Sequence, residues 1–209
     1  MKIPHLLAIS SPEVRAGSAW RQWCSDLAAA GVDGLQVRRK DCTDRDLLAL
    51  AAEARVSTAA TVTLLVNARP DIALAADADG VQLPAQGLPV TRVRATFDHL
   101  SANSFLVGRS THSPDEVRLA RDQGADFALF GPLFETPSKA GRIAPRGLVA
   151  LSEAVSCGLP VLALGGIDGE NAPQALDAGA WGIAAIRWFE NPLARRSDYA
   201  ALLLRWRQP

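Results

Sequence analysis

Eight short apolar runs rich in β-branched residues recur along the chain, and a stretch with helical periodicity follows each of them. The predicted strands cover residues 5–10, 34–38, 62–67, 80–83, 105–109, 127–131, 160–166 and 182–187. The predicted helices cover roughly residues 18–31, 43–59, 70–76, 90–98, 114–123, 146–157, 168–178 and 193–206. Strands that are apolar on both faces are typical of parallel sheets covered by helices. Eight such units predict the α/β class and a (β/α)8 TIM barrel.

A recurring phrase introduces several of these strands. It reads "AAGVDGLQV", "AADADGVQL", "DQGADFALF" and "DAGAWGIAA", with a small residue or glycine closing the helix before each apolar run. Glycine suits a helix end because it adopts a left-handed backbone without a Cβ penalty. The alternative fold, an open doubly wound sheet, would need a glycine-rich dinucleotide turn after the first strand, and "ISSPEVRAG" does not supply one.

The composition bounds the remaining possibilities. A chain of 209 residues predicts one domain spanning 1–209, long enough to bury a large core. Its net charge of zero gives no indication of a nucleic-acid partner. No apolar run approaches the length of a membrane span, and the N-terminus has too short an apolar run for a secretory leader. We therefore expect a cytoplasmic protein without membrane or nucleic-acid partners.

Cysteine and tryptophan add little to this assignment. Three cysteines without a metal-binding spacing are expected to be free thiols used in packing: Cys24, Cys42 and Cys157. Four tryptophans in or near helices fit either the core or the interface of a homo-oligomer: Trp20, Trp181, Trp188 and Trp206.

Catalytic residues of such barrels follow the strands, so the residues after each apolar run are the candidates. Gln36, Arg38 and Lys40 alternate at the end of the second strand, so they share one face, and Arg39 points to the other. Surface charge is the default reading for basic residues. Cations on an interior face need a partner, and an anionic ligand supplies one. Asn67 ends the third strand and is a weak signal for ligand binding.

His112 lies after the fifth strand. Ser113, Pro114 and Glu116 form a helix start, which places the histidine just before the cap at the barrel mouth. A lone histidine is usually structural. An imidazole at this junction can both give and take a proton near neutral pH, which makes His112 the candidate catalytic residue.

Two further loops favour an anion. Residues 131–147 form the longest loop, and its hydroxyl and basic side chains suit a phosphate or diphosphate unless the loop is merely solvated: Thr136, Ser138, Lys139, Arg142 and Arg146. After the seventh strand, Gly165 and Gly166 let the backbone approach a ligand ahead of a helix. Ile186 and Arg187 end the eighth strand beside them, where barrels commonly bind phosphate.

The sequence resembles the thiamin phosphate synthase superfamily, which includes the TenI-like thiazole tautomerases. The resemblance spans nearly the whole chain and rests on "QVRRK", "VNARPDIALAADADGVQL", "GRSTHSPDE", "FGPLFETPSKAG", "APRGL" and "LALGGI". It implies that one group of residues would hold a pyrimidine diphosphate: Gln36, Arg38, Lys40, Asn67, Ser110 and Lys139. It implies that a second group would hold a thiazole phosphate: Thr136, Ser138, Gly165, Gly166, Ile186 and Arg187.

Two positions depart from the synthase pattern. The resemblance implies metal-binding aspartates after the asparagine and at the end of the fourth strand's loop, but this chain has Ala68 and Gly87 there. Asp71 falls at the following helix start, and Arg187 stands where the pattern has a small serine. Phe134, Glu135 and Thr136 resemble the tautomerase form of the loop.

We therefore expect a TenI-like thiazole tautomerase, an isomerase that forms an aromatic thiazole carboxylate phosphate. His112 would be its general acid and base, and Arg38 or Arg187 would neutralise the substrate carboxylate. This function predicts no cofactor and no metal, with a small phosphorylated thiazole as the ligand. Two alternatives stay open: a thiamin phosphate synthase with an altered Mg²⁺ site, which would need Mg²⁺, and a non-catalytic phosphate-binding regulatory module.

Overall fold

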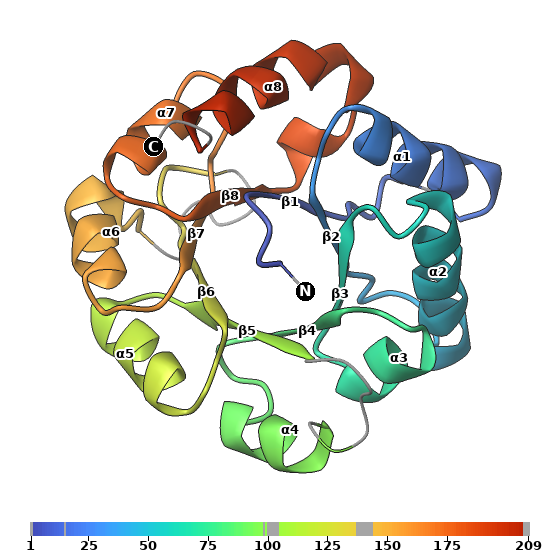
Figure 1. Ribbon diagram of the computed structural model, residues 1–209, viewed down its shortest axis with the longest axis horizontal. Helices are drawn as coiled ribbons and strands as arrows, with labels where there is room; N and C mark the ends of the chain where they lie inside the picture. The colour runs from blue at the N-terminus through green and yellow to red at the C-terminus, as the bar shows by residue number, and fades with distance from the viewer. Residues whose placement is uncertain (1, 15, 98, 100–104, 137–143, 207–209) are drawn as a thin grey trace.

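The chain folds into a closed barrel of eight parallel strands surrounded by helices, as the computed structural model shows (Figure 1). The structure describes residues 2–14, 16–97, 99, 105–136 and 144–206. The strands are β1 (Leu6–Ile9), β2 (Gly34–Val37), β3 (Thr63–Asn67), β4 (Gly80–Leu83), β5 (Leu106–Thr111), β6 (Phe127–Phe130), β7 (Val161–Leu164) and β8 (Gly182–Ala185). Each strand pairs in parallel with the next, and β8 pairs with β1, which closes the barrel. The predicted α/β class and (β/α)8 fold are confirmed.

The helices form an outer ring (Figure 1). Helices α1 to α7 each connect one strand to the next, and α8 follows β8. They are α1 (Ser18–Ala29), α2 (Asp44–Ser57), α3 (Pro70–Ala75), α4 (Val90–Phe97), α5 (Pro114–Asp122), α6 (Gly147–Val155), α7 (Ala172–Asp177) and α8 (Arg196–Arg205). Two short 3₁₀ turns follow β8: η2 (Arg187–Phe189) and η3 (Leu193–Arg195). No helix of the described segments is long and apolar enough to span a bilayer.

Two apolar cores divide the buried side chains. The larger lies between the strands and the helices and includes Trp20 and Trp188, which settles these two tryptophans as core residues. The smaller fills the barrel interior and consists of Leu7, Ile9, Leu65, Leu106, Phe127, Leu129, Leu162 and Ala184. Ile3 packs against it from the segment that crosses the amino end of the barrel (Figure 1). The interior is therefore packed, as in other barrels, and ligands are left to the carboxyl ends of the strands.

The recurring phrase before the even-numbered strands has a structural role that glycine alone does not explain. Asp33, Asp79 and Asp126 lie just before β2, β4 and β6. Their carboxylates accept backbone hydrogen bonds from the preceding strands, from Leu6 N at 2.7 Å, Leu64 N at 2.6 Å and Val107 N at 2.6 Å. Before β8 the corresponding residue is a tryptophan, Trp181, and its indole nitrogen donates to Ile3 O at 3.4 Å. Each of the strand pairs β1–β2, β3–β4 and β5–β6 is thus joined by its own aspartate carboxylate at the amino end of the barrel.

One predicted helix begins later than expected. The sequence predicted a helix over 168–178, whereas α7 begins at Ala172. The carboxylate of Asp168 accepts from Glu170 N at 3.0 Å and Asn171 N at 3.2 Å, and the Asn171 amide oxygen accepts from Asp168 N. These local bonds compete with helix formation. The predicted helix start at residue 168 is therefore wrong. Gly165 and Gly166 still precede α7, with residues 167–171 between them and its first residue.

Candidate active site

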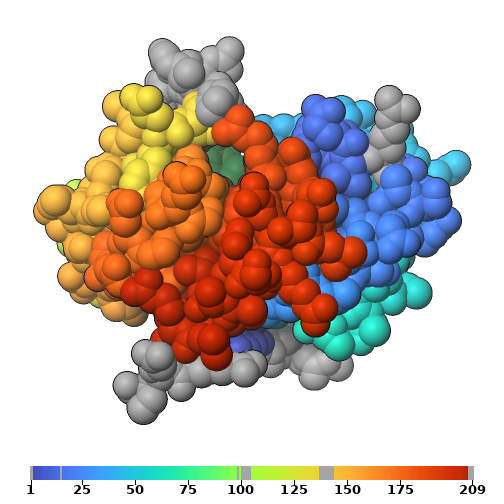
Figure 2. Space-filling view, turned by 90° about the horizontal axis from the view of Figure 1, so that it is seen from above, coloured from blue at the N-terminus to red at the C-terminus, as the bar shows by residue number. Residues whose placement is uncertain are grey.

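A cavity of about 710 Å³ opens at the carboxyl ends of the strands. Residues that end or follow each of the eight strands line it, and the contribution after β4 is limited to Pro84 and Ala85. Figure 2 shows the surface hollowed beside the orange-red segment that follows β8. Of the residues predicted from the sequence, the cavity wall contains Gln36, Arg38, Lys40, Asn67, Ser110, His112, Thr136, Gly165, Gly166, Ile186 and Arg187. Ser138 and Lys139 lie outside the described residues. The individual roles of these residues stay predictions.

The end of β2 points its polar side chains into this cavity. Gln36, Arg38 and Lys40 line it, whereas the guanidinium of Arg39 points away and donates to Val14 O at 2.6 Å, as the alternation predicts. Ser10 Oγ accepts from Arg38 N at 2.8 Å and donates to Arg38 O at 3.1 Å, which fixes the backbone of Arg38. Burial lowers the pKa of the Arg38 guanidinium from its ordinary value. Arg38 is therefore a partly desolvated cation on a rigid strand end.

Amide side chains form the floor of the cavity. Gln36 is 2% exposed, and its Nε2 donates a long hydrogen bond of 3.4 Å to Asn67 Oδ1. The Gln36 Oε1 atom is buried and has no partner among the described residues. Buried amide oxygens are normally satisfied, so this atom is placed to accept a hydrogen bond from a ligand. Gln82 lies deeper and donates from Nε2 to Ser110 Oγ at 3.1 Å, which orients that hydroxyl.

The helix start predicted around His112 is present. Ser113 caps α5, its Oγ accepting from Glu116 N at 3.2 Å, and Pro114 begins the helix. The Glu116 carboxylate in turn accepts from His112 N at 2.6 Å. The imidazole Nδ1 lies within hydrogen-bonding distance of Gly131 O. Both the backbone and the ring of His112 are therefore fixed at the cavity wall.

The glycine loop after β7 packs closely on the loop after β6. Gly165 and Gly166 have positive φ angles of 101° and 68°. A Cβ at Gly165 would lie 2.7 Å from Pro132 Cα, and one at Gly166 would lie 2.4 Å from Glu135 O, so only glycine fits either position. Arg187 lies beside them at the start of η2. The rest of that turn is anchored, because Trp23 Nε1 donates to Phe189 O and Tyr199 OH to Trp188 O, both at 2.8 Å.

The sequence reasoning missed the contribution of the first and fourth loops. Ser11, Pro12 and Glu13 after β1 and Pro84 and Ala85 after β4 also line the cavity. Ser11 is buried and directly follows a strand, so the rule applied to the other strands would have found it. Glu190, beyond η2, has no comparable signal in the sequence.

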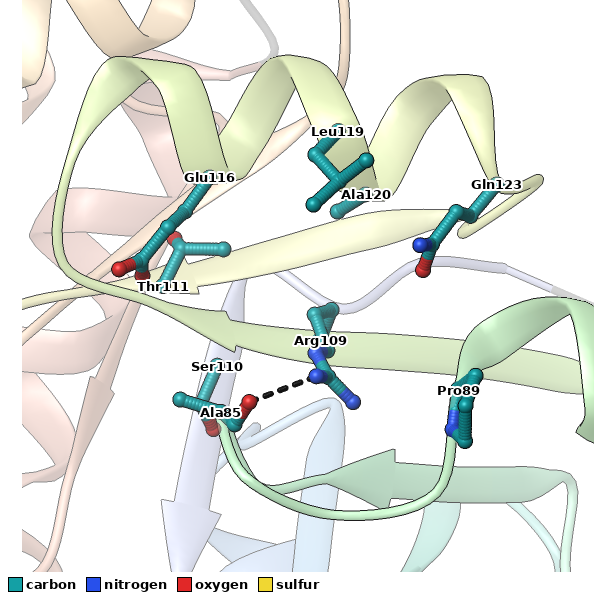
Figure 3. Close-up of a pocket in the computed structure, with 9 residues that line it drawn as sticks. All are labelled: Ala85, Pro89, Arg109, Ser110, Thr111, Glu116, Leu119, Ala120 and Gln123. Carbon is teal, nitrogen blue, oxygen red and sulfur yellow. Dashed lines mark hydrogen bonds between the residues drawn. The ribbon is translucent and has the colours of Figure 1, made fainter.

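A smaller pocket of about 240 Å³ adjoins the cavity outside the barrel, between α5 and the loop of residues 84–89 (Figure 3). Arg109 extends from β5 toward that loop (Figure 3). Its guanidinium donates to Ala85 O at 2.6 Å and to Leu88 O at 2.8 Å. Ala85, Ser110 and Thr111 border both hollows. Arg109 therefore fixes the loop of residues 84–89, which forms one wall of the larger cavity, from the side that faces the smaller pocket.

The model of the thiamine monophosphate synthase and TenI family matches residues 6–189. The chain belongs to this family. A thiamine-phosphate synthase of Chlorobium luteolum is 42% identical over 159 residues, 75% of this chain and 73% of that protein. A relative from Aquifex aeolicus is 39% identical over 192 residues, 90% of this chain and 99% of its own length. A solved thiamine phosphate pyrophosphorylase of Pyrococcus furiosus has a TM-score of 0.80 and 26% identity, with 95% of this chain and 96% of that one covered.

These relatives correct the expected activity. The expectation of a TenI-like thiazole tautomerase, and with it of an isomerase, is wrong: the relatives at 36–44% identity carry the name of the synthase, a transferase. The error came from the weight given to two missing carboxylates at Ala68 and Gly87. The polar floor, the cations Arg38 and Lys40, and the single cation Arg187 line the same cavity, and these agree with the alternative activity.

Proposed function

We propose that the protein is a thiamin phosphate synthase, a transferase that joins a pyrimidine diphosphate to a thiazole phosphate. In this reaction the bond from the pyrimidine's methylene carbon to a diphosphate oxygen breaks. The diphosphate leaves with the electron pair, and the thiazole nitrogen forms the new bond to that carbon. The reaction therefore needs one place for a diphosphate and another for a phosphate within reach of each other.

One observation carries the proposal: two anion-binding arrangements border a single cavity. Arg38 and Lys40 lie at the end of β2, and the glycine loop with Arg187 lies after β7 and β8. Within the described part of the chain, the side chains of Arg38, Lys40 and Arg187 have no hydrogen bond or ion pair to the protein. A cavity of about 710 Å³ has room for two small heterocycles.

The polar floor suits the pyrimidine. Gln36 Oε1 accepts a hydrogen bond from the substrate's amino group, and Asn67 holds the Gln36 amide in place. Arg38 and Lys40 bind the diphosphate, since cations with charge-assisted hydrogen bonds are effective partners for phosphate oxygens. His112, whose Nδ1–H donates to Gly131 O, presents Nε2 to the substrates. In the doubly protonated imidazolium form of the ring, Nε2 donates a hydrogen bond or a proton to the departing diphosphate.

The second anion position takes the thiazole phosphate. Gly165 and Gly166 allow phosphate oxygens to approach the backbone, and Arg187 supplies the charge. The anchored turn at Trp188 and Phe189 keeps Arg187 beside the glycine loop. The two substrates then meet above the packed barrel interior formed by Ile9 and Leu129, which also line the cavity.

The decisive experiment is a direct assay of coupling. The purified protein is incubated with hydroxymethylpyrimidine diphosphate and thiazole phosphate, with and without Mg²⁺, and thiamin phosphate is measured by chromatography. We expect product, and we expect Gln36→Ala to lose most of it while the exposed variant Arg196→Gln does not. Absence of product under both conditions, while an authentic synthase succeeds alongside, contradicts the proposal.

A further inference from the structure

A magnesium ion is implied by the synthase activity, and the residues of this chain do not fit it. Mg²⁺ prefers carboxylate oxygens together with substrate phosphates. Glu13 and Glu190 are the carboxylates at the described cavity wall, both exposed and on separate loops. In the described segments no three histidine, cysteine, aspartate or glutamate side chains come close enough to hold a metal. Residues 137–143 contribute no carboxylate either, because their sequence is "PSKAGRI".

The acidic side chain nearest in sequence to the expected metal position is already bound. Asp71 accepts two hydrogen bonds from the guanidinium of Arg69, at 2.9 and 2.6 Å. Hydrogen bonding by Arg69 holds the pKa of the Asp71 carboxyl below its ordinary value. Arg69 also pairs with Asp44. The Asp71 carboxylate is therefore paired with the Arg69 guanidinium and is not left for a metal ion.

Cations occur at the mouth where carboxylates do not. Arg38 and Lys40 line the cavity without a protein partner for their side chains within the described residues. Arg38 is partly buried on a fixed backbone, and a buried charge without a partner is unfavourable. The partner that removes this penalty is an anion bound in the cavity.

We propose that the protein binds the diphosphate group directly through Arg38 and Lys40, without a divalent cation held by protein carboxylates. The inference rests on the proposed function, because diphosphate is the leaving group of that reaction. Its chemical content is specific: the synthase pattern combines these two cations with a metal ion at the diphosphate, and in this chain the cations neutralise the diphosphate without a metal held by protein carboxylates.

The test is calorimetric titration of the whole protein with inorganic pyrophosphate, first in EDTA and then with excess Mg²⁺. We expect binding in EDTA, with an affinity that Mg²⁺ improves by less than about threefold. Binding that requires Mg²⁺, or that Mg²⁺ tightens by about tenfold or more, equivalent to about 1.4 kcal/mol, overturns the inference. So does the absence of binding in both conditions.

Matched variants locate the site. Lys40→Gln, at an exposed position, and Arg38→Gln are each expected to weaken binding in EDTA by about tenfold, as loss of a charge-assisted contact predicts. Arg196→Gln, on the exposed face of α8, should leave the affinity unchanged. Equal affinity in all three variants overturns the assignment.

The outcome is separable from that of the proposed function. Pyrophosphate binding in EDTA without formation of thiamin phosphate supports the diphosphate site and contradicts the synthase. Product formation together with strictly Mg²⁺-dependent pyrophosphate binding supports the synthase and overturns the metal-free site.

Discussion

The imidazole of His112 is hydrogen-bonded through Nδ1 to the carbonyl oxygen of Gly131. A carbonyl only accepts, so Nδ1 carries the proton and Nε2 is left for the ligand. Gly131 itself is confined, because a Cβ there would lie 2.0 Å from Leu164 O. The packing of two loops therefore decides which ring nitrogen of His112 can act on a substrate.

Replacement of His112 by asparagine should separate the two ring nitrogens. The asparagine amide can still donate to Gly131 O but offers nothing in place of Nε2. We expect kcat for thiamin phosphate formation to fall by about 10² or more, the range for a proton donor, with little change in the KM of either substrate. His99→Asn, outside the cavity, is the control. Unchanged turnover in His112→Asn would remove this residue from the mechanism.

Arg109 is a positioning residue for the loop of residues 84–89. Arg109→Ala removes two hydrogen bonds to carbonyl oxygens and should lower the free energy of unfolding by about 2 kcal/mol. The KM of the pyrimidine diphosphate should rise more than kcat falls, because Pro84 and Ala85 form part of the cavity wall. Arg109→Lys should recover part of both losses. Arg118→Ala, on the exposed face of α5, is expected to change neither, and a matching loss there would contradict a specific role.

Ala68 has a φ of 63°, in the left-handed region that disfavours alanine. Its N–H is fixed to Gln82 O at 2.9 Å, so the backbone cannot easily relax. Asparagine and aspartate tolerate this conformation better. Ala68→Asn is therefore expected to raise the free energy of unfolding by up to about 1 kcal/mol, measured by urea denaturation. A loss of stability would show that the neighbouring contacts, rather than φ, dominate.

A double variant at Ala68 and Gly87 tests whether the missing carboxylates account for metal-independent binding of diphosphate. Ala68→Asp with Gly87→Asp supplies two carboxylates, although a Cβ at Gly87 would lie 2.9 Å from Pro84 Cδ and needs a small shift. Pyrophosphate binding should then become about tenfold tighter with Mg²⁺ than in EDTA. The doubly substituted asparagine variant has the same shape without the charge and should show no such dependence. Identical behaviour of the two would contradict the placement of these positions.

Asp126 should be more important for stability than an exposed aspartate on the same segment. Its carboxylate accepts from Val107 N at 2.6 Å and from the Arg94 guanidinium at 2.5 Å. Asp126→Ala is expected to reduce the free energy of unfolding by about 2–3 kcal/mol, because a buried strand N–H loses its acceptor. Asp122→Ala removes a pair with Arg121 at the surface and should cost less than about 0.5 kcal/mol. Equal costs in urea denaturation would contradict the role assigned to Asp126.

The order of elements could be predicted almost completely from the sequence. Strand boundaries such as 80–83 agree with β4, and the alternation of Gln36, Arg38 and Lys40 correctly separates them from Arg39. Continuous apolar runs carry this information because both faces of the strands are buried. The start of α7 could not be predicted in the same way, since Asp168 and Asn171 compete locally with the helix.

The composition of the site was predictable and its chemistry was not. Polar residues after strands converge on one cavity because parallel strands share their carboxyl end. Ser11 was missed although it follows a strand, and Glu190 was missed because it lies beyond a 3₁₀ turn. The choice of isomerase over transferase was wrong because it relied on the two missing carboxylates. Their absence bears on metal binding, whereas the cations that line the cavity bear on which anionic substrates bind there.

The aspartates before β2, β4 and β6 bear on how far this molecule can be altered. They hold strand pairs together at one end of the barrel, and every residue proposed to meet a substrate lies at the other end. Loops around the mouth can therefore be exchanged or randomised in search of new acceptor heterocycles while these three carboxylates are left untouched. The protein offers a scaffold in which foldability and substrate choice can be selected separately.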